Sequence, residues 1–242
     1  MELVILAAGQ GSRIFNKIKK NKCLINIKRT TLIEKVILDF RSINTFSKVK
    51  IVVGYKKDNI IRKLNSYKNI QYIYNKDYKS REMLYSLKLG IQNAKSDLIV
   101  SYSDIIFSKK IFSEIFKLKN KKNFLLPINK NWKNIWIKRN KEILSDCESL
   151  IHDKKFNLKE IGNSIQNIKQ PMGQFMGVFY IPKNKLKKTL NLIELNKKNK
   201  KMHTTNFIDF LVKKNEKVKC IPSNSYWYEF DDYEDYVRFK KK

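Results

Sequence analysis

Short apolar runs alternate with amphipathic segments over the first hundred residues of the chain. After Glu2, residues 3–8 form a continuous apolar run, which is typical of a strand buried on both faces, and the sequence Gly9-Gln-Gly-Ser-Arg13 follows it. The same alternation continues, with helices expected at 31–40, 58–67 and 83–93 and strands expected at 48–53, 70–74 and 97–102. Strand and helix taking turns predicts right-handed βαβ units and a mainly parallel sheet.

After Asp104 this regularity weakens. Strands are expected at 124–128, 143–151, 156–161 and 177–181, and a helix is expected at 204–214. The sequence therefore predicts an α/β fold, with a Rossmann-like, mostly parallel sheet flanked by helices and an antiparallel or mixed extension in the second half. We expect one domain over 1–242, made of a nucleotide-binding half (1–107) and an acceptor-binding half (108–242). The lysine- and asparagine-rich stretch 196–201 is a candidate linker.

Composition places the chain among globular proteins, with 42% hydrophobic and 31% charged residues. The apolar run at 3–8 is short and lacks a preceding basic region, so we expect no signal peptide, no membrane anchor and a cytoplasmic location. Cys23, Cys147 and Cys220 are far apart and form no CxxC pair. This spacing indicates reduced cysteines, without a disulfide framework or a zinc site.

The net charge of +30 comes mainly from lysine, because only seven of the 52 basic residues are arginines. Specific recognition of bases and phosphates favours the two-pronged arginine guanidinium, and the lysines are spread over the whole chain. We therefore expect no specific nucleic-acid partner, although so basic a protein could still attract polyanions without regard to sequence.

The glycine loop follows the first strand, where open parallel sheets bind their ligands. Gly9 and Gly11 would let backbone N–H groups approach phosphate oxygens, and Arg13 would add a guanidinium group able to grip two of them. The loop is neither a G-x-G-x-x-G fingerprint nor a P-loop. From the glycines alone, a simple tight turn fits as well as a phosphate-binding loop.

A wider window resembles the nucleotidyltransferase family that joins NTPs to small phosphorylated compounds. The matching sequences are Leu6-Ala-Ala-Gly-Gln-Gly-Ser-Arg13, Asn21-Lys-Cys-Leu24 and Thr31-Leu-Ile-Glu34, with Asn21 standing where the family has proline. The resemblance implies that Gly9–Arg13 wraps the triphosphate and that Lys22 neutralises charge at the α-phosphate. Arg13 and Lys22 are accordingly the expected catalytic residues.

Later segments, among them Val53-Gly-Tyr55 and Asn75–Leu87, look closest to the branch that uses CTP to activate phosphocholine or phosphonates. Glu82 stands where that branch has a polar amide. The nucleotide-binding residues implied by the resemblance are Leu6, Ala7, Ala8, Gly9, Gln10, Gly11, Ser12, Arg13, Lys22, Gly54, Tyr55, Glu82 and Ser86.

Three carboxylates are candidates for a metal site. Asp104 follows the strand expected at 97–102, and Glu229 and Asp231 would face the same side of an extended segment. Mg²⁺ takes a few carboxylate oxygens and fills its octahedron with water and phosphate, although a Glu-x-Asp pair is also common on a solvated surface. The resemblance implies that Asp104, Asp231 and Glu229 bind Mg²⁺. Because an acceptor phosphate is already anionic, neither His152 nor His203 is needed as a base.

The acceptor is expected to meet the second half of the chain, where Asp146, Glu148, Gln174 and Trp136 are the candidate contacts. Carboxylates beside an aromatic ring suit an ammonium group, whereas the tryptophans fit core packing equally well. The leading hypothesis is a Mg²⁺-dependent cytidylyltransferase that transfers CMP from CTP to a small phosphorylated amino-alcohol or phosphonate and releases pyrophosphate. A sugar-1-phosphate nucleotidylyltransferase and a non-catalytic polyanion-binding protein are the alternatives.

Overall fold

The computed structural model describes residues 1–80, 83–118, 122–139, 143–196 and 202–241. Its strands are β1 (Glu2–Ala7), β2 (Asn26–Ile27), β3 (Thr30–Thr31), β4 (Val49–Val53), β5 (Ile70–Tyr74), β6 (Leu98–Tyr102), β7 (Ile105–Phe107), β8 (Phe124–Asn129), β9 (Glu148–His152), β10 (Leu158–Ser164), β11 (Gln174–Phe175), β12 (Val178–Ile181), β13 (Val218–Ser223) and β14 (Trp227–Glu229). Its helices are α1 (Ser12–Ile18), α2 (Leu32–Arg41), α3 (Lys57–Lys63), α4 (Met83–Ile91), α5 (Lys110–Lys117), α6 (Trp132–Arg139), α7 (Ile143–Asp146), α8 (Leu186–Leu195), α9 (Thr204–Lys213) and α10 (Tyr233–Lys240), with 3₁₀ turns at Lys22–Leu24 and Lys183–Lys185.

The centre of the fold is an eight-stranded sheet in the order β11-β8-β12-β6-β1-β4-β5, with β13 paired to β8. Strands β6, β1, β4 and β5 are mutually parallel, as are β8 and β13, whereas β12 and β11 run antiparallel to their neighbours. This confirms the predicted mostly parallel sheet with a mixed extension. Strands from both halves of the sequence share this sheet, which places the second half beside the carboxyl ends of β1 and β6.

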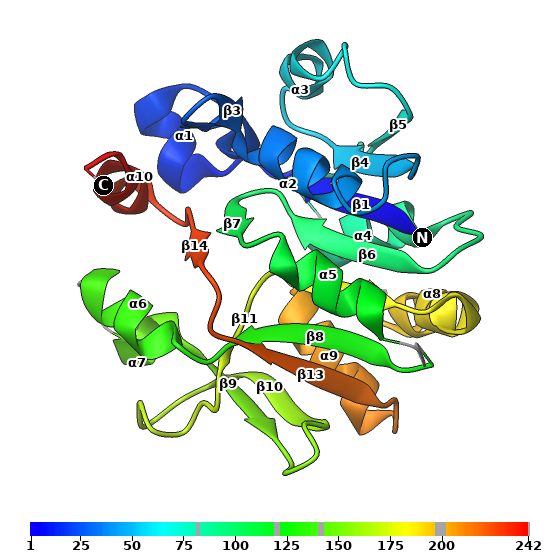
Figure 1. The fold of residues 1–242 in the computed structure, drawn as a ribbon, viewed down its shortest axis with the longest axis vertical. Coiled ribbons are helices and arrows are strands. Elements are labelled where there is room, and N and C mark those ends of the chain that lie inside the picture. The colour runs from blue at the N-terminus through cyan, green and yellow to red at the C-terminus, as the bar shows by residue number, and fades with distance from the viewer. Residues whose placement is uncertain (81–82, 119–121, 140–142, 197–201, 242) are drawn as a thin grey trace.

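Helices cover both faces of the sheet, as Figure 1 shows. Successive side chains of β1 point to opposite faces. Leu3 and Ile5 pack in the cluster that contains α2 and α5, and Val4 and Leu6 pack in the cluster that contains α4, α8 and α9. The burial of both faces explains why β1 reads as a continuous apolar run rather than as an alternating one.

A third apolar cluster joins the N-terminal loop region to the C-terminus. It combines Ile14 of α1, Ile25, Ile106 of β7 and Phe230, and the partly buried Phe239 of α10 packs against it. Strand β14 pairs antiparallel with β7, so the C-terminal segment returns to the loop that follows β6. This return brings residues after 226 back to the edge where β1 ends (Figure 1).

The second half contains more helix than the sequence pattern predicts. Helices α5, α6, α8 and α10 were not predicted, because strands without intervening helices, or no element, were expected there. The segment 143–151, which was expected to be one strand, forms α7 followed by β9. Several of these helices are short; α6, for example, has eight residues and buries Trp132 and Trp136, four positions apart. Asn196 is the one residue of the candidate linker that is described. None of the described helices combines the length and apolar character needed to cross a membrane.

Candidate active site

A cavity of about 540 Å³ opens beyond the carboxyl ends of β1 and β6. Leu6 and Ala7 of β1 and Tyr102 of β6 form its floor, and the glycine loop borders it on the N-terminal side. Residues from α6, α7, β9, β11 and β14 form the opposite wall. Most of the candidate residues predicted from the sequence line this one cavity.

The two glycines of the loop have different structural roles. Gly11 takes a left-handed backbone with φ of 60° just before α1, and a Cβ there would lie 3.1 Å from Cβ of Lys22. A Cβ on Gly9 would meet nothing within 4 Å and would project into open space. Gly11 therefore shapes the loop, whereas Gly9 leaves room at the cavity.

Lys22 is held at the cavity by the turn in which it lies. The preceding Asn21 has φ of −54°, close to the value a proline ring imposes, and its side chain donates a hydrogen bond to the carbonyl oxygen of Tyr55 (2.8 Å). Nζ of Lys22 lies 2.9 Å from Oδ2 of Asp104 and 4.0 Å from Oδ1 of Asp231. Burial lowers the pKa of Lys22, but attraction from these carboxylates outweighs it and raises that pKa above its ordinary value, so the side chain is charged.

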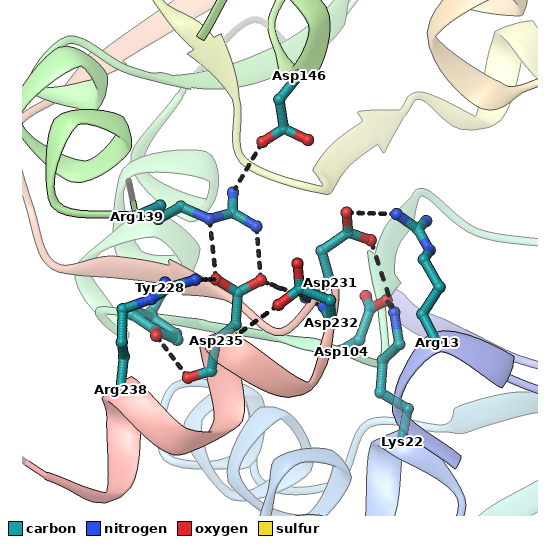
Figure 2. A network of polar contacts seen from close by, with 10 residues as sticks. All are labelled: Arg13, Lys22, Asp104, Arg139, Asp146, Tyr228, Asp231, Asp232, Asp235 and Arg238. Atoms are coloured by element: carbon teal, nitrogen blue, oxygen red, sulfur yellow. Dashed lines mark hydrogen bonds and ion pairs between the residues drawn. The ribbon is translucent and has the colours of Figure 1, made fainter. Parts of the chain in front are cut away.

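Asp104 and Asp231 meet because the C-terminal segment returns beside β7. Glu229 is paired with Ile105, and the N–H of Phe230 donates to the carbonyl oxygen of Asp104 (3.0 Å). Nη1 of Arg13 reaches the carboxylate of Asp231 at 2.7 Å (Figure 2). The two predicted catalytic cations thus contact two of the three predicted metal ligands.

Glu229 lies in the same cavity as these two aspartates. Burial raises the pKa of Glu229 to about 8, and repulsion from Asp104 and Asp231 adds to this shift. In the described part of the chain, no three or more His, Cys, Asp or Glu side chains converge closely enough to form a ready-made metal site. Instead, the Lys22 ammonium lies between the two aspartates.

The predicted acceptor residues line the other end of the cavity. Trp136 comes from α6, Asp146 from the end of α7, Glu148 from β9 and Gln174 from β11. Glu148 accepts a hydrogen bond from the hydroxyl of Thr205 (3.2 Å), and burial raises the pKa of this carboxyl. This end of the cavity therefore presents carboxylates beside aromatic rings.

Arg139 is a cavity residue that sequence reasoning missed. Its guanidinium donates to both oxygens of the Asp235 carboxylate, from Nε at 3.0 Å and from Nη2 at 2.6 Å, and both side chains are buried. The same guanidinium lies 4.9 Å from the ring centroid of Trp136, which stacks on Trp227. The ion pair joins α6 to α10 (Figure 2). Its two residues lie 96 positions apart, so no short sequence motif indicates it.

Other predicted nucleotide contacts do not line the cavity. Gly54 is packed so that a Cβ would lie 2.6 Å from the carbonyl oxygen of Ala8, and the ring of Tyr55 packs edge-on against Phe15. Ser86 is buried and accepts a hydrogen bond from Asn75. Ala8 and Gln10 are also absent from the lining, and Glu82 lies outside the described residues. Nucleotide contacts by these residues stay predictions.

Comparison with known proteins places this geometry in a family. Residues 3–160 match the MobA-like NTP transferase domain. The chain is 26% identical, over 96% of both chains, to the CTP:phosphoglutamine cytidylyltransferase of Campylobacter jejuni subsp. jejuni serotype O:2.

Solved structures share the fold at lower identity. A CTP:phosphocholine cytidylyltransferase from Streptococcus pneumoniae has a TM-score of 0.74 at 19% identity, over 99% of this chain and 97% of that one. An inositol-1-phosphate CTP transferase from T. maritima has a TM-score of 0.74 at 16% identity, over 99% and 93%. The resemblance first drawn from the glycine loop is confirmed, and the chain belongs to the family of MobA-like NTP transferase domains.

Proposed function

We propose that this nucleotidyltransferase transfers CMP from CTP to the phosphate of a small amine-bearing acceptor and releases pyrophosphate. The observation that carries the proposal is a single cavity with a glycine loop and two cations at one end and carboxylates beside aromatic rings at the other. The similarity over nearly full length to a cytidylyltransferase supports CTP as the donor.

At the nucleotide end, the chain supplies positive charge and close backbone approach. Gly9 leaves space for phosphate oxygens, and Arg13 and Lys22 stand beside that space. Both cations are now paired with aspartates, so a bound triphosphate would exchange carboxylate partners for phosphate oxygens. Positioning and neutralising charge on a phosphoryl group are the main tasks of a protein in such a transfer.

The proposed reaction needs no nucleophile from the protein. An oxygen of the acceptor phosphate attacks the α-phosphorus of CTP, and the bond from that phosphorus to the oxygen bridging to the β-phosphate breaks. The electron pair of that bond leaves with pyrophosphate. Lys22 and Arg13 would stabilise the negative charge that develops on the α-phosphoryl group and on the leaving group.

The residues present fit Mg²⁺ as a cofactor of this reaction. Asp104 and Asp231 offer hard oxygen ligands. Burial raises the pKa of Glu229 and repulsion from these two carboxylates adds to it, and a bound cation would offset that repulsion. Two or three carboxylates leave positions for phosphate oxygens, so we propose that the metal binds together with the nucleotide. When bound, Mg²⁺ would add further charge neutralisation at the phosphates.

At the acceptor end, charge and shape favour an ammonium group. Asp146 and Glu148 supply negative charge, and the buried Trp136 ring, which already stacks on Trp227 and lies beside the Arg139 guanidinium, forms part of the wall. Gln174 donates its side-chain amide to the carbonyl oxygen of Glu148 (2.8 Å), which fixes that part of the wall. Amino-alcohol phosphates, aminophosphonates and phosphorylated amino-acid amides, such as the phosphoglutamine named for the relative, share this chemistry.

Pyrophosphate release tests the proposal directly. The protein would be incubated with Mg²⁺ and each of CTP, UTP, ATP and GTP against phosphocholine, phosphoethanolamine, aminoethylphosphonate, phosphoglutamine and glucose 1-phosphate. We expect release with CTP and at least one amine-bearing acceptor. Turnover confined to glucose 1-phosphate, or to another nucleotide, would favour the sugar-1-phosphate alternative and contradict the proposal.

A further inference from the structure

Arg139 is a buried cation whose guanidinium is hydrogen-bonded to Asp235 along one edge. Its exposed fraction is 4%, and Asp235, which accepts two hydrogen bonds from it, is fully buried. Burial lowers the pKa of Arg139, but hydrogen bonds and attraction from Asp235 outweigh it, so the guanidinium stays charged. The pairing fixes the Nε and Nη2 edge of the guanidinium against α10 (Figure 2).

The remaining nitrogen, Nη1, points away from Asp235. It lies 3.7 Å from Oδ2 of Asp146, beyond hydrogen-bond distance, and the structure gives it no hydrogen bond to any described residue. Arg139 and Asp146 both line the cavity. A buried guanidinium held rigidly on one edge, with donors left over on the other, is suited to bind an oxyanion.

The position of Arg139 indicates which oxyanion it would meet. One carboxylate oxygen of Asp235 accepts from Nη2 of Arg139 and also from the backbone N–H of Asp231 (3.0 Å). The guanidinium therefore stands between the nucleotide end of the cavity and Asp146 at the acceptor end. Arg139 is also the only lysine or arginine that the second half contributes to the lining, among the residues the structure describes.

Resting on the proposed function, we propose that Nη1 of Arg139 binds the phosphate of the acceptor and holds it for attack on the α-phosphorus. Without such a cation, an anionic phosphate would enter a wall that carries the carboxyl groups of Asp146 and Glu148. The acceptor would then span the site, with its phosphate at Arg139 and its ammonium group toward Asp146 and Glu148.

Arg139→Lys is the principal test, because a lysine keeps the charge but cannot both pair with Asp235 along one edge and offer donors from another. Arg238→Lys is the matched control: Arg238 donates to the same carboxylate at 2.9 Å but does not line the cavity. Steady-state kinetics would give KM for CTP, KM for phosphoethanolamine, and the inhibition constant of inorganic phosphate against that acceptor. Thermal unfolding would show that each variant is folded.

We expect Arg139→Lys to raise both the acceptor KM and the phosphate inhibition constant by roughly ten-fold or more, with KM for CTP within about two-fold. Arg238→Lys should leave all three within about two-fold of the unmodified protein. An unchanged phosphate inhibition constant in folded Arg139→Lys would overturn the proposal. A parallel rise in KM for CTP would overturn it too, because Arg139 would then act through Asp235 on Asp231.

Two further experiments test whether Arg139 binds a phosphate or a carboxylate and cover the case in which Arg139→Lys does not fold. If KM rises for phosphoserine but not for phosphoethanolamine, Arg139 holds a carboxylate and the phosphate assignment is wrong. Should Arg139→Lys not fold, Asp146→Asn replaces it: removing the negative charge 3.7 Å from Nη1 should tighten inhibition by inorganic phosphate several-fold, and unchanged or weaker inhibition would contradict the proposal.

Failure of the proposed function is distinguishable from failure of this inference. If no acceptor is turned over with CTP, calorimetry would measure inorganic phosphate binding to the protein saturated with a non-hydrolysable CTP analogue and Mg²⁺. Phosphate binding that is lost in Arg139→Lys and kept in Arg238→Lys would support the anion site. Equal binding by both variants would overturn it.

Discussion

The ammonium of Lys22 lies 2.9 Å from the carboxylate of Asp104, although 82 positions separate the two residues in sequence. Lys22 follows the glycine loop, and Asp104 follows the strand next to β1 in the sheet. A lysine at this point balances carboxylates that would otherwise repel one another. The same cation is available to a triphosphate when a nucleotide enters.

Lys22→Ala should lower kcat/KM by roughly two orders of magnitude, because losing a cation from the transition state costs on the order of 3 kcal/mol. Steady-state pyrophosphate release would measure the change. Lys20→Ala removes an exposed lysine from the same loop and should leave kcat/KM nearly unchanged. Wild-type kinetics in Lys22→Ala would show that the lysine only balances Asp104.

Alanine at the two loop glycines should separate folding from nucleotide binding. Gly11→Ala should destabilise the protein by about 1–2 kcal/mol, because an L-residue is strained at a φ of 60° and its Cβ would press on Lys22. Gly9→Ala should leave stability unchanged but raise KM for CTP, since its Cβ would project into the space left for phosphate. Denaturant unfolding and CTP titration measure the two effects. Equal loss of stability in both variants would contradict these separate roles.

Sequence patterns predicted the parallel half of the fold well, because its strands are continuous apolar runs and its helices repeat apolar residues at helical spacing. Helix α2 illustrates this: Thr31 and Glu34 form the capping box at its start, and its apolar face packs on the sheet. Arg139 could not be found this way. Its partner Asp235 lies 96 positions later, and the exposed Ile137 obscures the helical period of the eight-residue α6.

Replacing the candidate metal ligands with neutral asparagine tests whether their carboxylates bind Mg²⁺. Asp104→Asn and Asp231→Asn should each abolish most turnover and raise the Mg²⁺ concentration that activity requires. Asp232→Asn should do little. The structure shows Asp232 capping α10 by accepting a hydrogen bond from the N–H of Asp235 (2.9 Å), a role that asparagine fills equally.

Kinetics across Mg²⁺ concentrations would compare these three variants. An equal loss of turnover in Asp231→Asn and Asp232→Asn would mean that activity depends on the conformation of this segment rather than on the Asp231 carboxylate. Asp104→Asn removes the nearer of the two carboxylates that contact Lys22, so thermal unfolding would also be measured for this variant.

Glu229 should make the ligand-free protein less stable as pH rises. Its folded pKa is raised from 4.5 to about 8 by burial and by Asp104 and Asp231, so between these values the folded state keeps a proton that the unfolded state has lost. Stability therefore falls from about pH 4.5 to about pH 8 and is not affected by this group below that window. Urea unfolding across this range should show a flatter profile in Glu229→Gln, and an identical profile would contradict the assignment.

The proposed reaction requires that the acceptor phosphate itself attacks the α-phosphorus of CTP, and oxygen labelling tests this step. Phosphoethanolamine labelled with ¹⁸O in its phosphate, or whichever amine-bearing acceptor is turned over, would react with unlabelled CTP, and ³¹P NMR and mass spectrometry would locate the label. We expect ¹⁸O in the bridge between the two phosphorus atoms of the CDP-linked product and none in pyrophosphate. Label in pyrophosphate, or CMP released without a linked product, would contradict it.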